Sequence, residues 1–475
     1  MAAYFAAMLL IGWLSSKGTD NQGFFNGGRK APSWVVAIAM IGAPMSGVTY
    51  VSVPGMVGTG AAMGYMQMVL GFFVGYLVIA YVLIPVFFRM NIVSIYQYLE
   101  DRFGASSHKT GAWFFFISKI LGAAVRLYLV CVTLQLMVFA PLGLPFILNV
   151  AVSMAIVLLY TFRGGVKSVI WNDTLKTVCM VVSIALAIIF IAKNMGLDLK
   201  GVAATIRDSS YSRIFFFDDI NHPEYFWKQF LAGIFTVVAM TGLDQDLMQR
   251  TLAGKNARES RKSLITSGSL QIPVIFMFLC LGALLYIYAG RNGIAETGDT
   301  LFPAVATGGS LPAAVGVLFV IGLVSCAYSA GGSALTALTT SFTVDILGAG
   351  KEDDEKRLAS TRKKVHLGMA LLMGAVIVVF HLLDTKSAID AVYKLASYTY
   401  GPILGMFAFG ISCKRPVRDR LVPLVAVAAP LICLVLQSNS ARWFGGYTFS
   451  YELILINALL TILGLCLLVK RKKDE

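Results

Sequence analysis

The amino-acid sequence predicts an all-α protein that crosses a membrane many times. Of its 475 residues, 57% are hydrophobic and only 13% are charged, whereas a soluble domain carries about 25% charged residues. The apolar residues form runs along the whole chain, and a helix needs about 20 of them to cross the hydrocarbon layer. Because lipid gives an exposed backbone no hydrogen-bond partner, such runs must be helices rather than open sheets.

Thirteen candidate spans follow from the positions of these apolar runs. They lie near 1–16, 34–57, 63–88, 110–137, 141–161, 168–192, 226–249, 263–289, 310–345, 365–383, 388–412, 420–437 and 450–469. No small-residue cleavage site follows the first run, so we expect no cleaved signal peptide. The sequence leaves no room for a soluble domain before, between or after the spans.

The charged loops between the spans predict the topology. Alternate loops are rich in Lys and Arg, including 250–262, the charged linker 351–364 and the end of the chain at 470–473. Positive loops remain in the cytoplasm, so we expect the N-terminus outside and the C-terminus inside a bacterial inner membrane. The net charge of +14 is explained by this topology and does not indicate nucleic-acid binding.

Residue patterns for other classes of protein are missing from the sequence. The seven cysteines form no CxxC pair and lie mostly in apolar runs, which is typical of small core residues. The four histidines are scattered near span ends and in loops, so an enzyme with a clustered catalytic or metal centre is disfavoured. No P-loop is present, which disfavours ATP-driven transport.

Two spans contain residues that break helices. The second span carries IGAPMSG (41–47), where Pro44 removes a backbone N–H and clashes with the preceding turn. The seventh carries MTGLD (240–244), a second weak point five spans later. Interrupted helices at corresponding places of two halves are typical of inverted-repeat transporters, in which the freed backbone binds an ion and a solute. The alternative is a proline kink without a ligand.

Ionisable residues inside spans are costly in a membrane and are therefore candidates for function. Arg126 lies in the middle of LGAAVRLYLV, where its guanidinium would bind a solute carboxylate through two hydrogen bonds. The alternative is a structural pair with a buried acid or with backbone carbonyls.

Asp173 and Lys176 stand one turn apart in VIWNDTLKTV, on the same face of a helix. Asp173 would hold a cation and Lys176 would neutralise it; the alternative is a mutual ion pair near the cytoplasmic end. We expect Lys119 and Lys394 to lie near the surface, and Asp244 and Asp246 to serve as helix-end structure.

Small and hydroxylated residues gather in the ninth span, in SCAYSAGGS (325–333). Hydroxyl and carbonyl oxygens suit a hard cation that has shed its water. Small residues also permit close packing of membrane helices, and that is the alternative interpretation.

Several motifs, in order, resemble the solute:sodium symporter family. They are FFNGGRKAPSW (24–34), SIYQYLEDRFG (94–104), RGGVKSVIWNDTLKT (163–177), GLDQDLMQRTLAGKNARESRKS (242–263) and SYTYGPILGMFAFGI (397–411). The resemblance covers nearly the whole chain and implies a LeuT-type 5+5 inverted-repeat bundle of about 13 helices. It implies a single transporter domain, 1–475, with an extra leading helix (1–16), a ten-helix core (34–412) and two trailing helices (420–469).

The resemblance also implies where sodium, the coupling ion, would bind. The family's main site takes carbonyls from its first core helix, which fall on Gly42 and Met45. Its eighth core helix adds a carbonyl and two hydroxyls, which fall on Cys326, Ser329 and Ala330; Ala330 has no oxygen to give. A second site in some members would use Asp173 and Ser333, while Lys176 stands where relatives often have glutamine.

The same resemblance implies the solute-binding residues. They are Ser46, Thr49, Gln67, Arg126, Tyr398 and Tyr400. The sugar-transporting branch has an aromatic gate where this chain has Met240 and Thr241, which makes a hexose the less favoured solute. Arg126 matches the place where the sialic-acid branch holds a carboxylate, so we expect an anionic solute, either a sialic-acid-like sugar acid or a monocarboxylate.

The sequence therefore predicts a sodium-coupled symporter that works by alternating access. Its partners would be the solute, sodium and the lipid bilayer, with no obligate protein partner. Two alternatives remain open at this stage. Lys176 would replace the cation in a proton-coupled or sodium-independent transporter, or the chain would bind solute as a sensor without transporting it.

Overall fold

The computed structural model describes residues 2–29, 31–220, 222–309, 311–349, 354–382, 388–444, 447, 449 and 452–470. These residues form α-helices joined by short 3-10 and π turns, and their only β-type pairing is in two isolated bridges. The helices are α1 (Ala2–Ser15), α2 (Asn21–Asn26), α3 (Ser33–Gly42), α4 (Gly47–Met56), α5 (Tyr65–Val78), α6 (Ile84–Met90), α7 (Gln97–Arg102), α8 (Ala105–Leu134), α9 (Phe146–Thr161), α10 (Val166–Asn194), α11 (Leu199–Arg207), α12 (Phe226–Val237), α13 (Gln245–Thr251), α14 (Ala257–Asn292), α15 (Leu301–Thr307), α16 (Ala313–Ser341), α17 (Glu355–Leu382), α18 (Ala388–Ser412), α19 (Val422–Trp443) and α20 (Leu453–Leu467).

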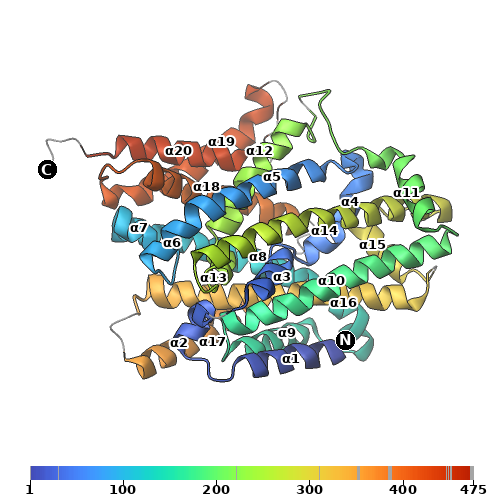
Figure 1. Cartoon of the computed structure of the whole chain (residues 1–475), viewed down its shortest axis with the longest axis horizontal. Helices are drawn as coiled ribbons and strands as arrows, with labels where there is room; N and C mark the ends of the chain where they lie inside the picture. The colour runs from blue at the N-terminus through green and yellow to red at the C-terminus, as the bar shows by residue number, and fades with distance from the viewer. Residues whose placement is uncertain are drawn as a thin grey trace.

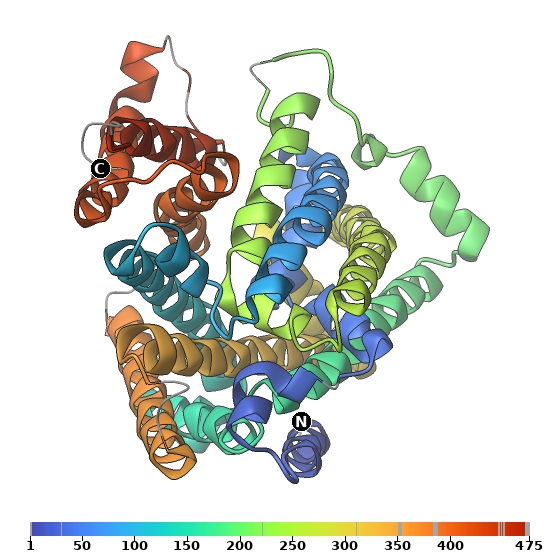
Figure 2. The ribbon, with the colours of Figure 1, turned by 60° about the vertical axis from the view of Figure 1, so that its left-hand side comes forward.

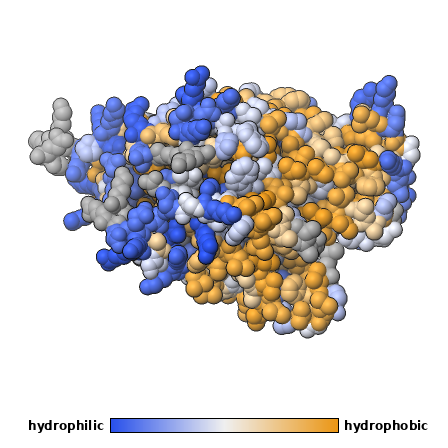
Figure 3. Space-filling model, turned by 60° about the horizontal axis from the view of Figure 1, so that its bottom comes forward, coloured by the Kyte–Doolittle hydropathy of each residue, from blue (hydrophilic) through white to orange (hydrophobic). Residues whose placement is uncertain are grey.

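The surface and the helix lengths are those of a multi-pass membrane protein. Seven helical segments of the described chain are long and apolar enough to cross a bilayer, or eight when the bent pair α12–α13 is taken as one span. Figure 3 shows a broad hydrophobic region with hydrophilic residues gathered toward the two ends of the long axis. Each expected span coincides with a helix or a broken helix, although the number of crossings stays a prediction.

The charged linker predicted at 351–364 is largely helical. Residues 351–353 lie outside the described residues, and α17 already begins at Glu355. The helix is therefore longer than the expected span 365–383. Lys and Arg side chains favour helices as Leu does, so the charge run extends the helix instead of interrupting it.

Helices from distant parts of the sequence pack side by side. α10 packs against both α3 and α16, α5 packs along α12, and α18 packs against α8 and α20 (Figure 1). Figure 2 shows α1 at one edge of the bundle and the trailing helices α19 and α20 at another, with the segment around α11 running outside the bundle. The helices that carry the predicted site residues therefore meet in the interior.

The first predicted helix break is confirmed. α3 ends at Gly42 and α4 begins at Gly47. Ser46 is extended (φ −112°, ψ 177°) and acts as the N-cap of α4, and its amide donates to Thr49 Oγ1 at 3.3 Å. An N-cap of this type replaces the hydrogen bonds that the first helical turn lacks, so the break is a built feature rather than a simple kink.

The second predicted break is also confirmed. α12 passes through a π turn at Val238–Gly242, and α13 leaves it at an angle of 76°. Asp244 caps α13, where its carboxylate accepts from the amide of Leu247 at 3.2 Å. The expectation that Asp244 serves a helix end is therefore confirmed.

Candidate functional site

A large cavity lies between the two helix breaks. Its volume is about 470 Å³, and it is lined by both broken helices, by α5 and α8, and by the segment before α12. Small-molecule sites in proteins usually have volumes of about 300–1,000 Å³. The cavity is therefore large enough for a solute of many atoms, and it lies where broken-helix transporters bind their solutes.

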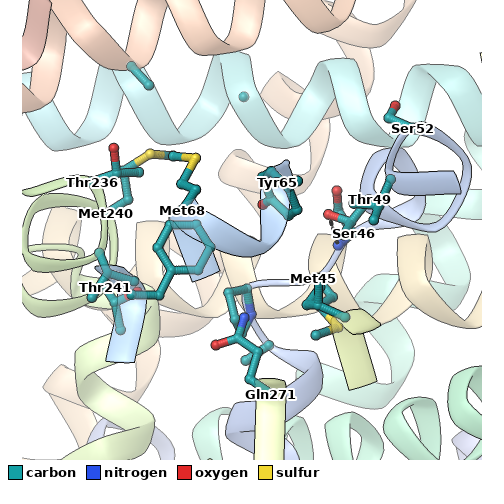
Figure 4. A pocket seen from close by; sticks show the side chains of 18 of the residues that line it. Met45, Ser46, Thr49, Ser52, Tyr65, Met68, Thr236, Met240, Thr241 and Gln271 are labelled. Atoms are coloured by element: carbon teal, nitrogen blue, oxygen red, sulfur yellow. Dashed lines mark hydrogen bonds between the residues drawn. The ribbon is translucent and has the colours of Figure 1, made fainter. Parts of the chain in front are cut away.

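Hydroxyl-bearing and apolar side chains both line the cavity. Ser46, Thr49 and Ser52 project from the start of α4, as Figure 4 shows. Met68 of α5 and Met240 of the second break lie together on another side of the same space. A solute with both polar and apolar faces suits this lining.

Arg126 of α8 brings a positive charge to the wall of the cavity. Its side chain is partly buried and lines the space. No ion pair or hydrogen bond joins it to a residue that the structure describes, in contrast to Lys119 and Arg250, which also line the cavity. The structural-pair interpretation of Arg126 is therefore not supported, and its guanidinium is open to an anionic group.

The floor of the cavity is a network of buried ion pairs. Lys119 Nζ lies 2.7 Å from Asp246 and 3.1 Å from Asp244, and Arg250 lies 2.6 Å from Asp246. Tyr400 donates to Asp244 from α18. The expectation that Lys119 is near the surface is wrong: only 7% of it is exposed, because two acids on α13 neutralise its charge inside the bundle.

Asp173 joins the same network from α10. Its carboxylate lies 3.0 Å from Arg250 Nε and accepts a hydrogen bond from Ser329. The structure thus brings two of the predicted cation ligands together, from α10 and α16, in a fully buried place. Neither of these two lines the cavity, which is separated from them by Arg250 and Asp246.

Lys176 differs from the other buried cations. Its side chain is completely buried, and its Nζ has no hydrogen-bond partner among the described residues. No ion pair joins it to Asp173 within 4.0 Å, although the two charges interact electrostatically. The alternative of a mutual ion pair is therefore wrong, because Arg250 and Ser329 already occupy Asp173.

The remaining predicted cation ligands surround the contact of α3, α10 and α16. Met45 reaches the cavity, while Gly42 packs so closely on α10 that an added Cβ would lie 2.3 Å from Thr177 Oγ1. Cys326 and Ser333 are buried in α16, and Ser333 lies beside Asp246. The charge of this region is balanced by three acids and three bases: Asp173, Asp244, Asp246, Lys119, Lys176 and Arg250.

Four of the six predicted solute-binding residues line the cavity, namely Ser46, Thr49, Arg126 and Tyr400. Gln67 does not: its amide donates to the carbonyl of Glu224 at 2.9 Å and accepts from the amide of Phe216 at 3.0 Å. Tyr398 does not line the cavity, and its carbonyl accepts from Asn457 of α20 at 3.1 Å.

Two charged groups of the cavity, Arg250 and Glu224, are not predicted by the sequence patterns. Arg250 belongs to a basic segment that indicates topology, although its spacing of four residues from Asp246 also favours an ion pair on one helix face. Glu224 stood in a long polar loop and lines the cavity. Nothing in the local sequence distinguishes it from the other acids of that loop.

Comparisons with known proteins give a consistent result. The model of the sodium:solute symporter family matches residues 24–419. The chain is 25% identical to a sodium/sialic acid symporter of Aliivibrio fischeri, over 96% of this chain and 91% of that protein. It is 26% identical to a sodium-coupled monocarboxylate transporter of Danio rerio, over 90% of this chain and 67% of that protein. A solved structure of a Na+-coupled sialic acid symporter in its substrate-bound outward-open state has the same fold, with a TM-score of 0.83 and 20% identity over 98% of this chain and 95% of that chain.

Proposed function

Because the chain belongs to the sodium:solute symporter family, we propose that it couples inward sodium flow to the uptake of a small anionic organic solute. The chain is a transporter of many membrane spans, and the relatives named above are transporters as well. The sodium gradient and the membrane potential, which is worth about 2.3 kcal/mol per charge for each 100 mV, would supply the driving force.

One observation carries the choice of an anionic solute. Arg126 is the basic side chain of the cavity that has no protein partner among the described residues, since Lys119 and Arg250 are both paired with acids. A planar guanidinium binds a carboxylate through two parallel hydrogen bonds. The names of the relatives, one for sialic acid and one for monocarboxylates, agree with a carboxylate on the solute.

Sodium would bind beside the first helix break. The carbonyls of Gly42, Met45 and Cys326 and the hydroxyl of Ser329 would form the main site, with a water in place of the hydroxyl that Ala330 lacks. Asp173 and Ser333 would serve a second site. Asp173 already meets Ser329, which supports a cation in this region and makes its affinity sensitive to Arg250 and Lys176.

Transport would proceed by alternating access within one domain. The core 34–412 would consist of two inverted repeats of five helices, each beginning with one of the broken helices, with the helix at 1–16 and those at 420–469 outside it. The N-terminus would face the periplasm and the C-terminus the cytoplasm of a bacterial inner membrane. Sodium and solute would couple because each binds one conformation more tightly than the other.

Uptake into proteoliposomes tests the proposal. We expect the purified chain to accumulate radiolabelled N-acetylneuraminate or propionate only with an inward sodium gradient, and Arg126→Ala to abolish that uptake. Arg291→Ala removes an exposed guanidinium at the end of α14 and should leave uptake unchanged. Normal uptake by folded Arg126→Ala would refute the role of this side chain.

A second candidate is transport without sodium, and Lys176 favours it. Its buried ammonium has no hydrogen-bond partner among the residues that the structure describes and supplies the third positive charge against Asp173, Asp244 and Asp246. In this alternative the ammonium takes the place of the coupling cation. Uptake that ignores sodium but follows an inward proton gradient would support this candidate and exclude sodium coupling.

A further inference from the structure

Glu224 is a second charged group of the cavity that the structure leaves unpaired. It lies in the segment before α12 and lines the same space as Arg126. No ion pair or side-chain hydrogen bond connects its carboxylate to another described residue, and the adjacent His222 instead accepts from the backbone amide of Glu224 at 3.1 Å. The described cavity wall thus carries one unpaired cation and one unpaired anion.

The backbone around Glu224 is held firmly in place. Gln67 Nε2 donates to its carbonyl at 2.9 Å, and the amide of Phe216 donates back to Gln67 at 3.0 Å. The carboxylate lies against the start of α5, where a Cβ added at Gly64 would be 2.9 Å from Glu224 Oε2. The backbone that carries this carboxylate is therefore pre-organised, and only the side chain loses freedom when a ligand arrives.

Arg126 and Glu224 belong to different elements and carry opposite charges, so one small ion cannot neutralise both. Arg126 projects from α8 and Glu224 from the segment before α12, and the hydroxyls of Ser46 and Thr49 line the same cavity. An ionised carboxylate accepts hydrogen bonds and cannot donate them. A solute that satisfies both groups therefore needs a carboxylate at one place and hydrogen-bond donors at another.

Resting on the proposed function, we propose that Glu224 is a specificity-determining residue that accepts hydrogen bonds from the hydroxyl or amide groups of a polyfunctional sugar acid. The solute's carboxylate binds Arg126, and its donor-rich part binds Glu224. The cavity of about 470 Å³ fits such a solute better than a three-carbon acid, which would leave most of the space and the Glu224 carboxylate without a partner. Simple monocarboxylates are therefore poor solutes of this chain.

Competition between two acids tests this inference. In proteoliposomes, the unaltered chain should take up N-acetylneuraminate with a KM at least about tenfold below that of propionate, since a charged hydrogen bond is worth that factor or more. Glu224→Gln should raise the KM for N-acetylneuraminate about tenfold and leave the KM for propionate unchanged or lower. The matched control is Glu296→Gln, which removes an exposed carboxylate outside the cavity and should change neither value.

The possible failures are distinguishable. If Glu224→Gln leaves the ratio of the two KM values unchanged, or if the unaltered chain prefers propionate, Glu224 does not set specificity, although anionic transport through Arg126 still stands. If the unaltered chain takes up neither acid, the proposed function fails and this inference fails with it. Because the contacts that hold residue 224 in place use its backbone, folding of Glu224→Gln is expected and is checked by its chromatographic profile.

Discussion

Removing the charge of Asp246 should destabilise the protein strongly, because this carboxylate holds two buried cations. It lies 2.7 Å from Lys119 and 2.6 Å from Arg250, and all three side chains are almost fully buried. Breaking a buried ion pair costs about 3–5 kcal/mol, mainly because a charge is left without compensation. Lys119 keeps Asp244 and Arg250 keeps Asp173, so we expect Asp246→Asn to cost about 3 kcal/mol, the lower end of that range.

The assay is unfolding of the detergent-solubilised chain followed by tryptophan fluorescence. The matched control is Asp208→Asn, which removes the acid of an exposed pair with Arg207 at 2.9 Å and should leave the free energy of unfolding close to that of the unaltered chain, because water screens such a pair. The double variant Lys119→Met/Asp246→Asn should recover part of the loss, giving an interaction energy of about 1–3 kcal/mol. Equal losses of unfolding free energy for Asp246→Asn and Asp208→Asn would refute the reasoning that the buried ion pairs at the cavity floor stabilise the protein by compensating one another's charges.

Three further predictions follow from the site. Ala330→Ser restores a hydroxyl beside the first helix break and should lower the half-saturating sodium concentration for uptake several-fold; an unchanged sodium dependence would argue against a site there. Gly42→Ala should destabilise the chain by about 1–3 kcal/mol, because the new Cβ would lie 2.3 Å from Thr177 Oγ1, whereas Gly368→Ala meets no atom within 4 Å and should be neutral or stabilising in thermal unfolding. Burial raises the pKa of Glu224 to about 7, so the acceptor is protonated at pH 6 and ionised at pH 8. The charged or titratable groups His222, Arg126 and Lys119 also line the cavity. Because the ionised carboxylate is the stronger acceptor, affinity for N-acetylneuraminate should rise between these pH values, and Glu224→Gln should flatten this dependence of affinity on pH.

The local sequence predicted the structure correctly wherever one residue type forces a helix to end or to begin. Pro44 and the neighbouring glycines predicted the first break, and the structure ends α3 at Gly42 and restarts the helix at Gly47. Asp244 was predicted to serve a helix end, and in the structure it caps α13, where its side-chain acceptor satisfies a free amide of the first turn.

Partners across the bundle were harder to predict than helices. Lys119 was expected near the surface because a lone lysine in an apolar run gives no sign of its partner. The acids that neutralise it lie on α13, more than 120 residues later. For Asp173 and Lys176, which are one turn apart, a mutual ion pair was the alternative to a cation site, but Arg250 and Ser329 are the partners of the carboxylate.

The amino-acid sequence by itself determined the all-helical membrane architecture, the two breaks and the presence of Arg126, because apolar run lengths, proline and a charge in an apolar span act within a few residues. Only the tertiary structure decided which charges are compensated and which face the cavity. Compensation depends on helices that are distant in sequence and meet in space: α13 and α10 neutralise one another's charges, while Arg126 and Glu224 keep theirs open to the cavity.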